Sequence, residues 1–267
     1  DLHIRSRRQR KMCIRDRSLW ARSADTVAEI NKRHTNKKYL PDAVLPKNLV
    51  AHTDLAAVVS SADVLVMGVP SNSFRDVLKQ LRPFVRPWIP IVSLTKGLES
   101  GTDLRMTEVI QGELPGHPVG VLTGPNLARE IMAGQAAASV IAMVDDIIVQ
   151  ELQKIFNSGL FRVYTNDDVI GCELGGVLKN IIAIAVGMGI GLGAGDNTRS
   201  ALITRGLAEI TRLGVAMGGR AETFSGLTGM GDMLATCISA QSRNHHVGVQ
   251  LGKGRHIDDI INEMVMV

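Results

Sequence analysis

The 267-residue sequence predicts an α/β part built on a mainly parallel sheet, followed by an all-α part. Its composition, 45% hydrophobic and 21% charged, is typical of a globular chain with a substantial core. Strand-like and helix-like segments alternate from Ser18 to Ser158, and several strands are continuously apolar, as in a sheet that helices cover on both faces. Beyond Asp168 only helical spacing recurs, which places the change of fold class near that residue.

The α/β part alternates short apolar segments with amphipathic ones. We predict strands over residues 18–22, 49–53, 62–69, 89–94, 119–122 and 138–144. We predict helices over residues 24–34, 55–60, 74–81, 104–114, 127–133 and 148–158. In the first of these helices, Val27 and Ile30 lie on one apolar side.

The all-α part opens with two long helical patterns, over residues 169–188 and 198–217. In the second, apolar residues recur at spacings of three and four, and Asp196 or Asn197 is the predicted N-cap. A glycine-rich turn over 226–231 and further helical stretches follow it.

These patterns predict three parts of the chain. Residues 1–17 form an unstructured leader, residues 18–167 an α/β domain, and residues 168–267 an α-helical domain. The leader shows no apolar periodicity and no secretory signal, and we interpret it as non-native sequence. A nucleic-acid-binding arm or a localisation patch is the alternative interpretation.

The positive charge of the chain is concentrated in this leader. The formal charge is +4 and the sequence pI about 9.1. Residues 1–22 carry eight basic and two acidic side chains, whereas the other 245 residues carry 22 basic and 24 acidic ones. The body of the protein is therefore nearly neutral, and the overall pI does not by itself indicate an acidic partner.

Cysteine spacing and apolar run lengths argue against two further classes of protein. The three cysteines are widely spaced and form no CxxC pair, which argues against a disulfide framework or a thiolate zinc site and favours the cytoplasm. The longest uncharged apolar run, residues 181–195, is shorter than the roughly 20 residues of a spanning helix. We therefore expect no membrane span.

Three loops follow predicted parallel strands, at the sheet edge where open α/β folds bind ligands. They are residues 69–71, 95–97 and 123–126. Lys96 is the only cation among them and precedes a glycine, Gly97. A ligand-binding lysine and a solvated surface lysine are both compatible with this position.

A second candidate lies in the first long helix. Lys179 and Asn180 interrupt an otherwise apolar stretch, so Lys179 should be paired, face a cleft or have a shifted pKa. The preceding pair Gly175-Gly176 allows a backbone or a flat ligand to approach the helix closely. The alternative is a lysine whose long stem reaches solvent.

A third cluster lies near the end of the chain. It combines Asp232 and Thr236 with the run Ser242-Arg243-Asn244. A guanidinium and an amide side by side suit a phosphate monoester. The histidines that follow, 245 and 246, point in different directions on a helix and have no third ligand nearby, so we predict no metal.

Nine short motifs occur in an order that resembles one known family. The first five are Trp20-Ala21-Arg22, Tyr39-Leu40-Pro41, Val69-Pro70-Ser71, Thr95-Lys96-Gly97-Leu98 and Thr123-Gly124-Pro125-Asn126. The last four are Glu173-Leu174-Gly175-Gly176-Val177-Leu178-Lys179-Asn180, Ala201-Leu202-Ile203-Thr204-Arg205-Gly206, Gly229-Met230-Gly231-Asp232 and Ser242-Arg243-Asn244. Together they resemble the bacterial NAD(P)-dependent glycerol-3-phosphate dehydrogenase family over residues 18–267.

The resemblance implies a Rossmann-like dinucleotide-binding domain and a helical substrate domain. It implies reversible hydride transfer between dihydroxyacetone phosphate and sn-glycerol 3-phosphate, with NADP or NAD, in the supply of glycerophospholipids. The expected partner is a small phosphorylated molecule, with no nucleic acid, and a homodimer is the candidate assembly. Three alternatives stay open: a dehydrogenase of the 6-phosphogluconate or hydroxyacid type, an inactive fragment, and nucleic-acid binding through the leader.

The resemblance also carries residue roles onto matching positions. Lys179 matches the general acid/base, and Lys96 a lysine that contacts both substrate and cofactor. The substrate-binding residues implied are Lys96, Gly124, Asn126, Lys179, Asn180, Asp232, Thr236, Ser242, Arg243 and Asn244. The cofactor-binding residues implied are Arg22, Lys96, Ala128, Arg243 and Val267. Asn126 stands where the family often has serine, and Arg22 suits a 2′-phosphate, which favours NADP.

One departure from the family concerns the pyrophosphate-binding turn. The family opens with a strand and a GxGxxG turn, whereas no glycine precedes Gly68 here. We therefore expect the first strand, this turn and the helices beyond Val267 to be missing, and NAD(P)H to bind this chain weakly.

Overall fold

A computed structural model describes residues 17–264 of the chain. Its packing separates two compact units. The first comprises Asp1–Asp63 with Leu81–Arg86, and the second Val64–Gln80 with Pro87–Val267. The leader lies outside the described residues except for Arg17, and the predicted domain division at residue 167 stays a prediction.

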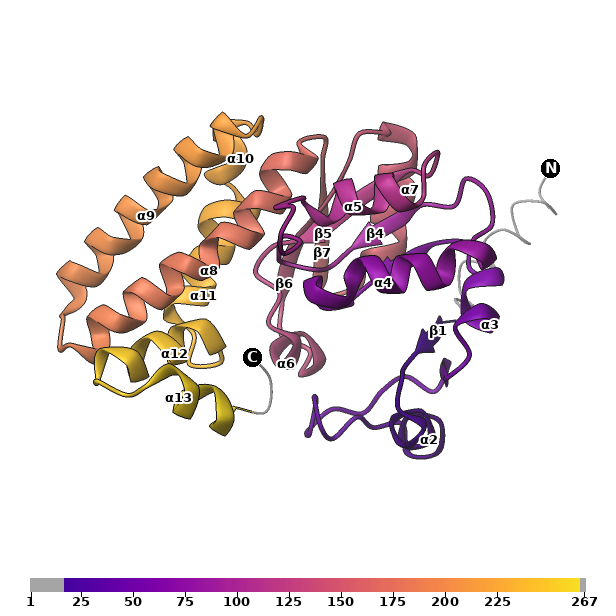
Figure 1. Ribbon diagram of the computed structural model, residues 1–267, viewed down its shortest axis with the longest axis horizontal. Helices are drawn as coiled ribbons and strands as arrows, with labels where there is room; N and C mark the ends of the chain where they lie inside the picture. The colour runs from indigo at the N-terminus through magenta and orange to yellow at the C-terminus, as the bar shows by residue number, and fades with distance from the viewer. Residues whose placement is uncertain (1–16, 265–267) are drawn as a thin grey trace. The chain divides into compact units, whose positions relative to one another are not determined.

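The first unit is a small parallel α/β structure. Its strands are β1 (Arg17–Trp20) and β2 (Leu49–His52), and its helices are α2 (Ala24–Arg33), α3 (Leu55–Ser60) and the 3-10 turn η1 (Arg82–Phe84) (Figure 1). Ile30, Leu45 and Ala51 form its core, with Val27 packed against them. Strand β1 begins one residue before the predicted start, and the other predicted elements of this unit are confirmed to within one residue.

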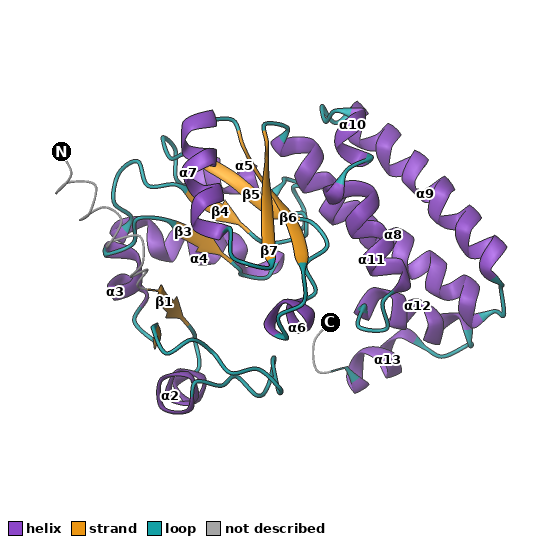
Figure 2. Ribbon diagram, turned by 180° about the vertical axis from the view of Figure 1, so that it is seen from behind, coloured by secondary structure: helices purple, strands orange, loops and turns teal. Residues whose placement is uncertain are grey.

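A five-stranded sheet organises the second unit. Its strands are β3 (Leu65–Met67), β4 (Ile91–Ser93), β5 (Val119–Thr123), β6 (Ala137–Met143) and β7 (Phe161–Asn166), and they lie side by side in that order (Figure 2). Every neighbouring pair is parallel except β5 and β6, which are antiparallel. The predicted mainly parallel sheet is therefore confirmed.

The sequence interpretation missed strand β7. The strand lies at the edge of the sheet, and only one of its residues, Val163, is buried. Exposed Arg162 and Tyr164 flank that residue, so the segment lacks the continuous apolar run that marked the inner strands. The predicted strand over 62–69 is shorter in the structure, because only residues 65–67 pair with β4.

Helices cover both faces of the sheet, as predicted. The four that accompany it are α4 (Ser71–Leu81), α5 (Met106–Glu113), α6 (Ala128–Met132) and α7 (Asp146–Phe156). On one face Leu122 and Ile141 pack with α7. On the other, Val121 and Val140 pack against the first long helix of the all-α part. Successive residues of β5 thus face opposite layers, as strand geometry requires.

Only helices follow β7 among the described residues. They are α8 (Val169–Gly191), α9 (Asp196–Ala216), α10 (Ala221–Phe224), the π-helical turn η2 (Leu227–Gly231), α11 (Asp232–Ile238), α12 (Arg243–Gly252) and α13 (Ile257–Glu263). Helix α8 lies at their centre and contacts α9, α11 and α12 (Figure 1). Leu174, Phe224 and Met233 are fully buried in the core they share.

The predicted N-cap of α9 is wrong. Helix α9 begins at Asp196, so Gly195 is the N-cap and Asp196 lies in the first turn. There its carboxylate pairs with Arg199 at 2.9 Å and lies near the positive end of the helix dipole. An acidic residue is favourable in either place, which is why its identity alone did not fix the boundary.

Helix α8 is long and apolar enough, by length and composition, to cross a membrane. It spans 23 residues, but 56% of its most apolar window is buried inside the protein. It also carries the buried side chains of Glu173 and Lys179. Both features are typical of the core helix of a globular domain.

Two pairs of glycines hold α8 against α12. A Cβ atom on Gly187 or Gly191 would strike the backbone of α12, and one on Gly248 or Gly252 would strike the backbone of α8. The two helices therefore touch backbone to backbone along one seam. This contact sets the position of the first turn of α12 relative to α8.

Candidate active site

The loops that follow β3 and β4 meet at one edge of the sheet. The Thr95 hydroxyl donates to the carbonyl of Val69 at 2.6 Å. A Cβ on Gly97 would lie 2.8 Å from the Ser71 hydroxyl, so the second loop passes close to the first. From this position the Lys96 ammonium donates to the carbonyl of Gly124 at 2.9 Å, which joins the loop after β5 to the other two.

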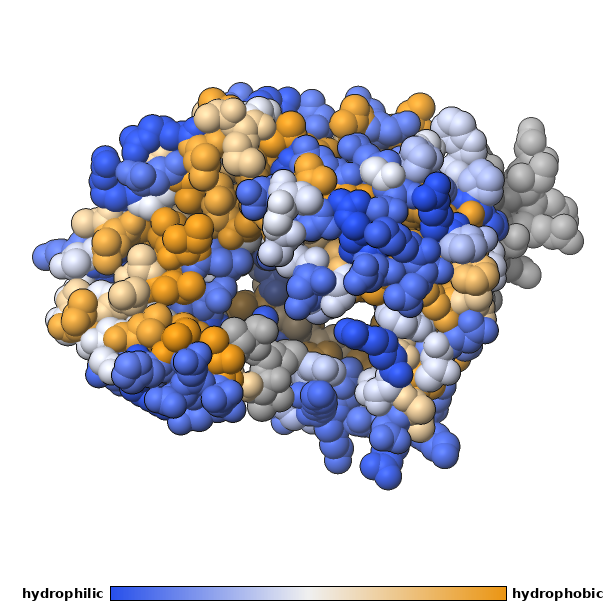
Figure 3. Space-filling view, in the orientation of Figure 1, coloured by the Kyte–Doolittle hydropathy of each residue, from blue (hydrophilic) through white to orange (hydrophobic). Residues whose placement is uncertain are grey.

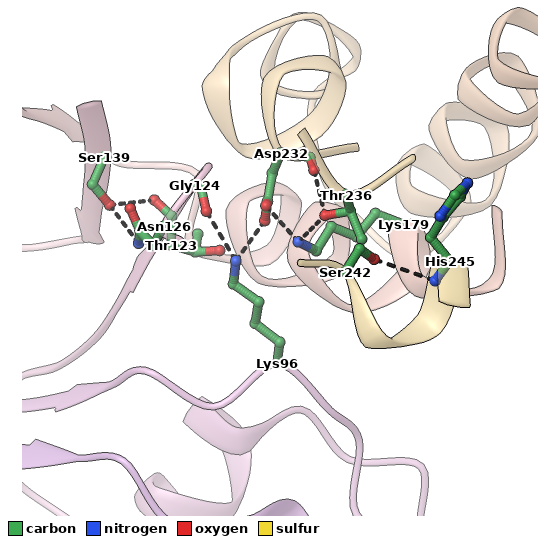
Figure 4. Close-up of polar contacts among 10 residues, drawn as sticks. All are labelled: Lys96, Thr123, Gly124, Asn126, Ser139, Lys179, Asp232, Thr236, Ser242 and His245. Carbon is green, nitrogen blue, oxygen red and sulfur yellow. Dashed lines mark hydrogen bonds and ion pairs between the residues drawn. The ribbon is translucent and has the colours of Figure 1, made fainter. Parts of the chain in front are cut away.

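Asp232 connects the two lysines singled out from the sequence. Its carboxylate is 1% exposed and accepts from Lys96 through Oδ2 at 2.7 Å and from Lys179 through Oδ1. The Lys179 ammonium also donates to the Thr236 hydroxyl at 2.6 Å (Figure 4). Lys179 is 6% exposed, so a lysine that reaches solvent is excluded, and the paired Lys96 is not a solvated surface lysine.

The pKa of Lys179 is lowered from 10.5 to about 8. Burial is the main cause, because a low-dielectric site disfavours the ammonium, and the charge of Lys96 acts in the same direction. The Asp232 carboxylate opposes both. Lys179 can therefore gain and lose a proton near neutral pH, as a general acid/base requires.

The loop after β5 presents unsatisfied polar atoms. The Asn126 amide nitrogen donates to the Ser139 hydroxyl at 3.0 Å, and that hydroxyl donates to the carbonyl of Thr123 at 2.8 Å. Gly124 has a φ of 136° and packs against Ser139, so a side chain there would be strained. Asn126 Oδ1 and Thr123 Oγ1 are left buried without a hydrogen-bond partner.

The predicted phosphate-binding run forms the start of α12. Ser242 is its N-cap and accepts from the backbone N–H of His245 at 3.2 Å. Arg243 and Asn244 are the first two helical residues, and Arg243 is exposed. An exposed guanidinium, an amide and the backbone N–H groups at a helix start can all bind an anion.

The structure brings together five of the site residues that the sequence predicted. Lys96, Gly124, Lys179, Asp232 and Thr236 are joined by direct hydrogen bonds or ion pairs.

The remaining predicted residues are more scattered. Asn180 follows Lys179 on α8, and Ala128 is the exposed first residue of α6. Arg22 is exposed after β1 and belongs to the first unit. Val267 lies outside the described residues.

Sequence reasoning missed two buried residues that support the site. Ser139 holds the Asn126 amide from the neighbouring strand β6, and Glu173 forms a buried ion pair on α8. Glu173 begins one of the family motifs but was given no role there, and Ser139 has no local signal, because serine is common in strands and loops alike. Within residues 17–264, no cluster of three or more histidine, cysteine, aspartate or glutamate side chains could hold a metal ion.

Two family models match consecutive parts of the chain. The model of the NAD-dependent glycerol-3-phosphate dehydrogenase N-terminus matches residues 10–148, and that of the C-terminus matches residues 168–267. The chain belongs to the NAD-dependent glycerol-3-phosphate dehydrogenase family. The N-terminal match includes part of the leader.

Curated members of the glycerol-3-phosphate dehydrogenase family are similar over most of the chain. A protein of Sphingopyxis alaskensis named glycerol-3-phosphate dehydrogenase (NAD(P)+) 2 is 71% identical over 93% of this chain and 75% of its own length. A protein of Mycobacterium tuberculosis named glycerol-3-phosphate dehydrogenase (NAD(P)+) 1 is 55% identical over 93% of this chain and 73% of its own length.

Solved structures of glycerol-3-phosphate dehydrogenases share the fold. The crystal structure from Coxiella burnetii has a TM-score of 0.89 at 38% identity and covers 94% of this chain and 77% of its own. The structure from Saccharomyces cerevisiae has a TM-score of 0.80 at 30% identity and covers 93% of this chain and 75% of its own. A ketopantoate reductase from Ralstonia eutropha, at 17% identity and a TM-score of 0.52, shares the fold alone.

Membership of the glycerol-3-phosphate dehydrogenase family makes this chain an oxidoreductase that uses NAD or NADP. The comparisons favour this activity over a 6-phosphogluconate or hydroxyacid dehydrogenase and over nucleic-acid binding.

Proposed function

We propose that Lys179 is the general acid/base for the interconversion of dihydroxyacetone phosphate and sn-glycerol 3-phosphate. The observation that carries this role is a buried ammonium, held by Asp232 and Thr236, whose pKa of about 8 lies close to neutrality. Lys179 is connected through Asp232 to Lys96, on the edge where open α/β sheets bind ligands.

Two buried oxygen atoms at this edge of the sheet have no hydrogen-bond partner, as expected of a site for a polar substrate and cofactor. Thr123 Oγ1 and Asn126 Oδ1 are buried without a partner, and polar groups in this state are usually satisfied by a ligand or water. When bound, the nicotinamide supplies or takes up the hydride. The residues that would hold the cofactor are those carried over by the family motifs: Arg22, Lys96, Ala128, Arg243 and Val267.

Lys179 and Lys96 have different roles in the proton transfer. During reduction, the Lys179 ammonium donates a proton to the oxygen on C2 of dihydroxyacetone phosphate as the hydride reaches that carbon, so the ketone becomes a secondary alcohol. In the reverse direction, the neutral amine takes the proton from that hydroxyl. The nearby charge of Lys96 stabilises the developing alkoxide and keeps the pKa of Lys179 low.

The start of α12 binds the phosphate in this proposal. Arg243 supplies two parallel donors, Asn244 an amide, and the helix start its backbone N–H groups. Since α12 is pressed against α8 by the glycine seam, the phosphate and the carbon next to Lys179 are held at a constant separation. Phosphate binding thus orients the reacting carbon.

We also propose that the protein acts in the cytoplasm and forms a homodimer. The two described cysteines, Cys172 and Cys237, are free and buried, which is compatible with a reducing compartment. Apolar side chains gather over the helical part of the second unit in Figure 3. Several large apolar side chains of α8, α9 and the turn between them are exposed, among them Ile181, Leu192 and Leu213. Such a face supports self-association. The product would supply the glycerol phosphate backbone of phospholipids.

A substrate comparison tests the proposed reaction. We expect oxidation of NADPH or NADH with dihydroxyacetone phosphate, and at most a trace with the ketones that dehydrogenases of the 6-phosphogluconate or hydroxyacid type reduce. The decrease in absorbance of the reduced nicotinamide measures it. A protein that turns over another phosphorylated ketone faster than dihydroxyacetone phosphate would contradict the proposal.

A further inference from the structure

Glu173 is a buried carboxylate whose hydrogen-bond partners all come from the start of α5. It is 2% exposed and accepts from the Thr107 backbone N–H at 3.0 Å, from the Thr107 hydroxyl at 2.5 Å and from Arg105 Nη1 at 3.2 Å. Thr107 is itself 2% exposed. One carboxylate of α8 therefore binds a single short segment of the sheet layer at three points.

The contacts of Glu173 with Thr107 and Arg105, which we call the clamp, carry a desolvation cost. Burial raises the pKa of Glu173, which opposes the ionised form, and the contacts from Thr107 and Arg105 offset that effect. A buried charge of this kind contributes little to stability compared with an apolar side chain of the same size. The need to hold α8 in position explains the buried charge of Glu173 better than a contribution to stability does.

The segment that Glu173 binds also carries Lys96. Between them, Leu98 and Arg105 pair as an antiparallel bridge, and the Glu99 N–H donates to the carbonyl of Leu104 at 2.9 Å. Residues 96–107 thus form a closed loop, which we call the lysine loop. One end of it binds Asp232 through Lys96, and the other binds Glu173.

The lysine loop is also anchored to the sheet layer. Arg75 of α4 binds both oxygens of Glu99, at 2.6 and 2.7 Å, and binds Glu113 of α5 at 2.6 Å. The loop is therefore fixed to α4 and α5, and the contacts of Glu173 join this fixed body to α8.

Helix α8 carries both Glu173 and Lys179. They are six positions apart, about 9 Å along the helix axis. Between them lies Gly176, where an added Cβ would be 3.6 Å from Lys96 Cγ and 2.7 Å from Thr123 Oγ1. The lysine loop and α8 are thus in contact at two places, Gly176 and Glu173, and Glu173 forms the hydrogen bonds and the ion pair.

We infer that Glu173, with Thr107 and Arg105, is a positioning site that holds α8 against the lysine loop, so that Lys179 and Lys96 bind opposite oxygens of Asp232. This inference rests on the proposed role of Lys179. Glu173 acts through the helix and does not itself touch the ammonium of Lys179.

Weakening this clamp changes the surroundings of Lys179. The groups that face its ammonium are Asp232, Thr236 and Cys237 of α11, together with Lys96 of the loop. If α8 separates from the loop, Lys96 moves away and water enters. Both changes favour the ammonium form, so the pKa of Lys179 rises from about 8 toward 10.5.

The clamp can be tested with isosteric variants of Thr107. Thr107→Val removes the hydroxyl donor and keeps the shape, Thr107→Ser keeps the donor, and Glu173→Gln removes the charge. In protein labelled with ¹³C,¹⁵N-lysine, we expect the Nζ signal of Lys179, assigned by its loss in Lys179→Arg, to titrate about one unit higher in Thr107→Val and Glu173→Gln. Thr107→Ser should titrate like the unchanged chain.

A second carboxylate on α8 separates positioning from stability. Asp168 caps the same helix and accepts from the Arg220 N–H at 2.8 Å and from the Thr223 hydroxyl at 2.6 Å, away from the lysine loop. Asp168→Asn should lower the thermal midpoint and leave the Lys179 titration in place. In the assay, Thr107→Val should lower kcat about tenfold, and Thr107→Ser less than about twofold.

An unchanged titration of Lys179 in Thr107→Val overturns the inference, whatever happens to the thermal midpoint. A shift of the same size in Asp168→Asn overturns it too, because the effect would then follow from general loosening of α8. The titration needs no turnover. Failure of the proposed reaction, detected by the substrate comparison, is therefore distinguishable from failure of the clamp.

Discussion

At the scale of single residues, the chemistry depends on where Lys179 is held. A lysine whose pKa falls from 10.5 to about 8 is less favourably protonated in the folded chain by roughly 3 kcal/mol. Because the folded pKa is the lower one, this cost is present below about pH 8 and disappears as the pH rises to 10.5. The lowered pKa of Lys179 therefore reduces folding stability at neutral pH, and it also makes the side chain able to donate a proton in this pH range.

Replacement of this lysine tests its role directly. We expect Lys179→Met to lower kcat about 1,000-fold, because the proton donor is lost, and to keep the fold, because the long apolar side chain fills the same volume. Assays of NADPH oxidation and far-ultraviolet circular dichroism measure the two effects. Lys253→Met, an exposed lysine just after α12, is the matched control and should keep full turnover. Turnover retained in Lys179→Met would refute the assigned role.

The lowered pKa of Lys179 also predicts opposite pH profiles for the two directions. Ketone reduction needs the ammonium, so its kcat/KM should fall as the pH rises through about 8. Alcohol oxidation needs the neutral amine, so its kcat/KM should rise over the same range. Initial rates between pH 6 and 10 at constant ionic strength check both. Profiles that fall together would point to a different titrating group.

At the scale of elements, the seam between α8 and α12 fixes the distance between Lys179 and the start of α12. Four glycines allow the backbones to touch, so no side chain is available to adjust the spacing. A seam of this kind has little tolerance for added volume, because backbone atoms cannot move aside as a flexible side chain can. The apolar periodicity that predicted the helices gave no indication of this glycine seam.

A pair of glycine substitutions tests the seam. Gly248→Ala places a Cβ against the carbonyl of Ile184, and we expect it to destabilise the fold by about 1–3 kcal/mol and to raise the KM for the phosphorylated substrate. Gly112→Ala, on α5 with nothing within 4 Å, should instead stabilise by up to about 1 kcal/mol, because alanine favours the helix. Urea denaturation measures both changes. Equal effects in the two variants would argue against a close-packed seam.

At the scale of the whole molecule, the two compact units differ in the size of their cores. Three buried residues form the cluster of the first unit, whereas the second unit contains several clusters on both faces of its sheet and around α8. A unit with fewer buried apolar contacts opens at a lower free energy.

Hydrogen exchange should therefore separate the units. We expect the backbone amides of β1 and β2 to exchange well before those of β5 and β6, as measured by mass spectrometry of peptic fragments after timed labelling. Equal protection of β2 and β5 would show that the small unit does not open independently.

Sequence patterns predicted the alternation of strands and helices and the change to helices after Asp168, and the family motifs supplied the candidate site residues. These features are local, because apolar period and motif spacing are properties of short segments. The sequence interpretation missed β7, because an edge strand with one buried residue has almost no apolar signature. It also placed the N-cap of α9 too late, because an acidic residue suits both the cap and the first turn.

Which of these residues contact one another depends on the fold. Lys96 and Asp232 are 136 residues apart, and Thr107 and Glu173 are 66 apart, so no local pattern could join them. The same holds for Ser139 behind Asn126, which depends on the antiparallel pairing of β5 with β6. Folding buries Lys179 and Asp232, so each of these charges must find its partner, and this requirement gives Lys179 its proton chemistry.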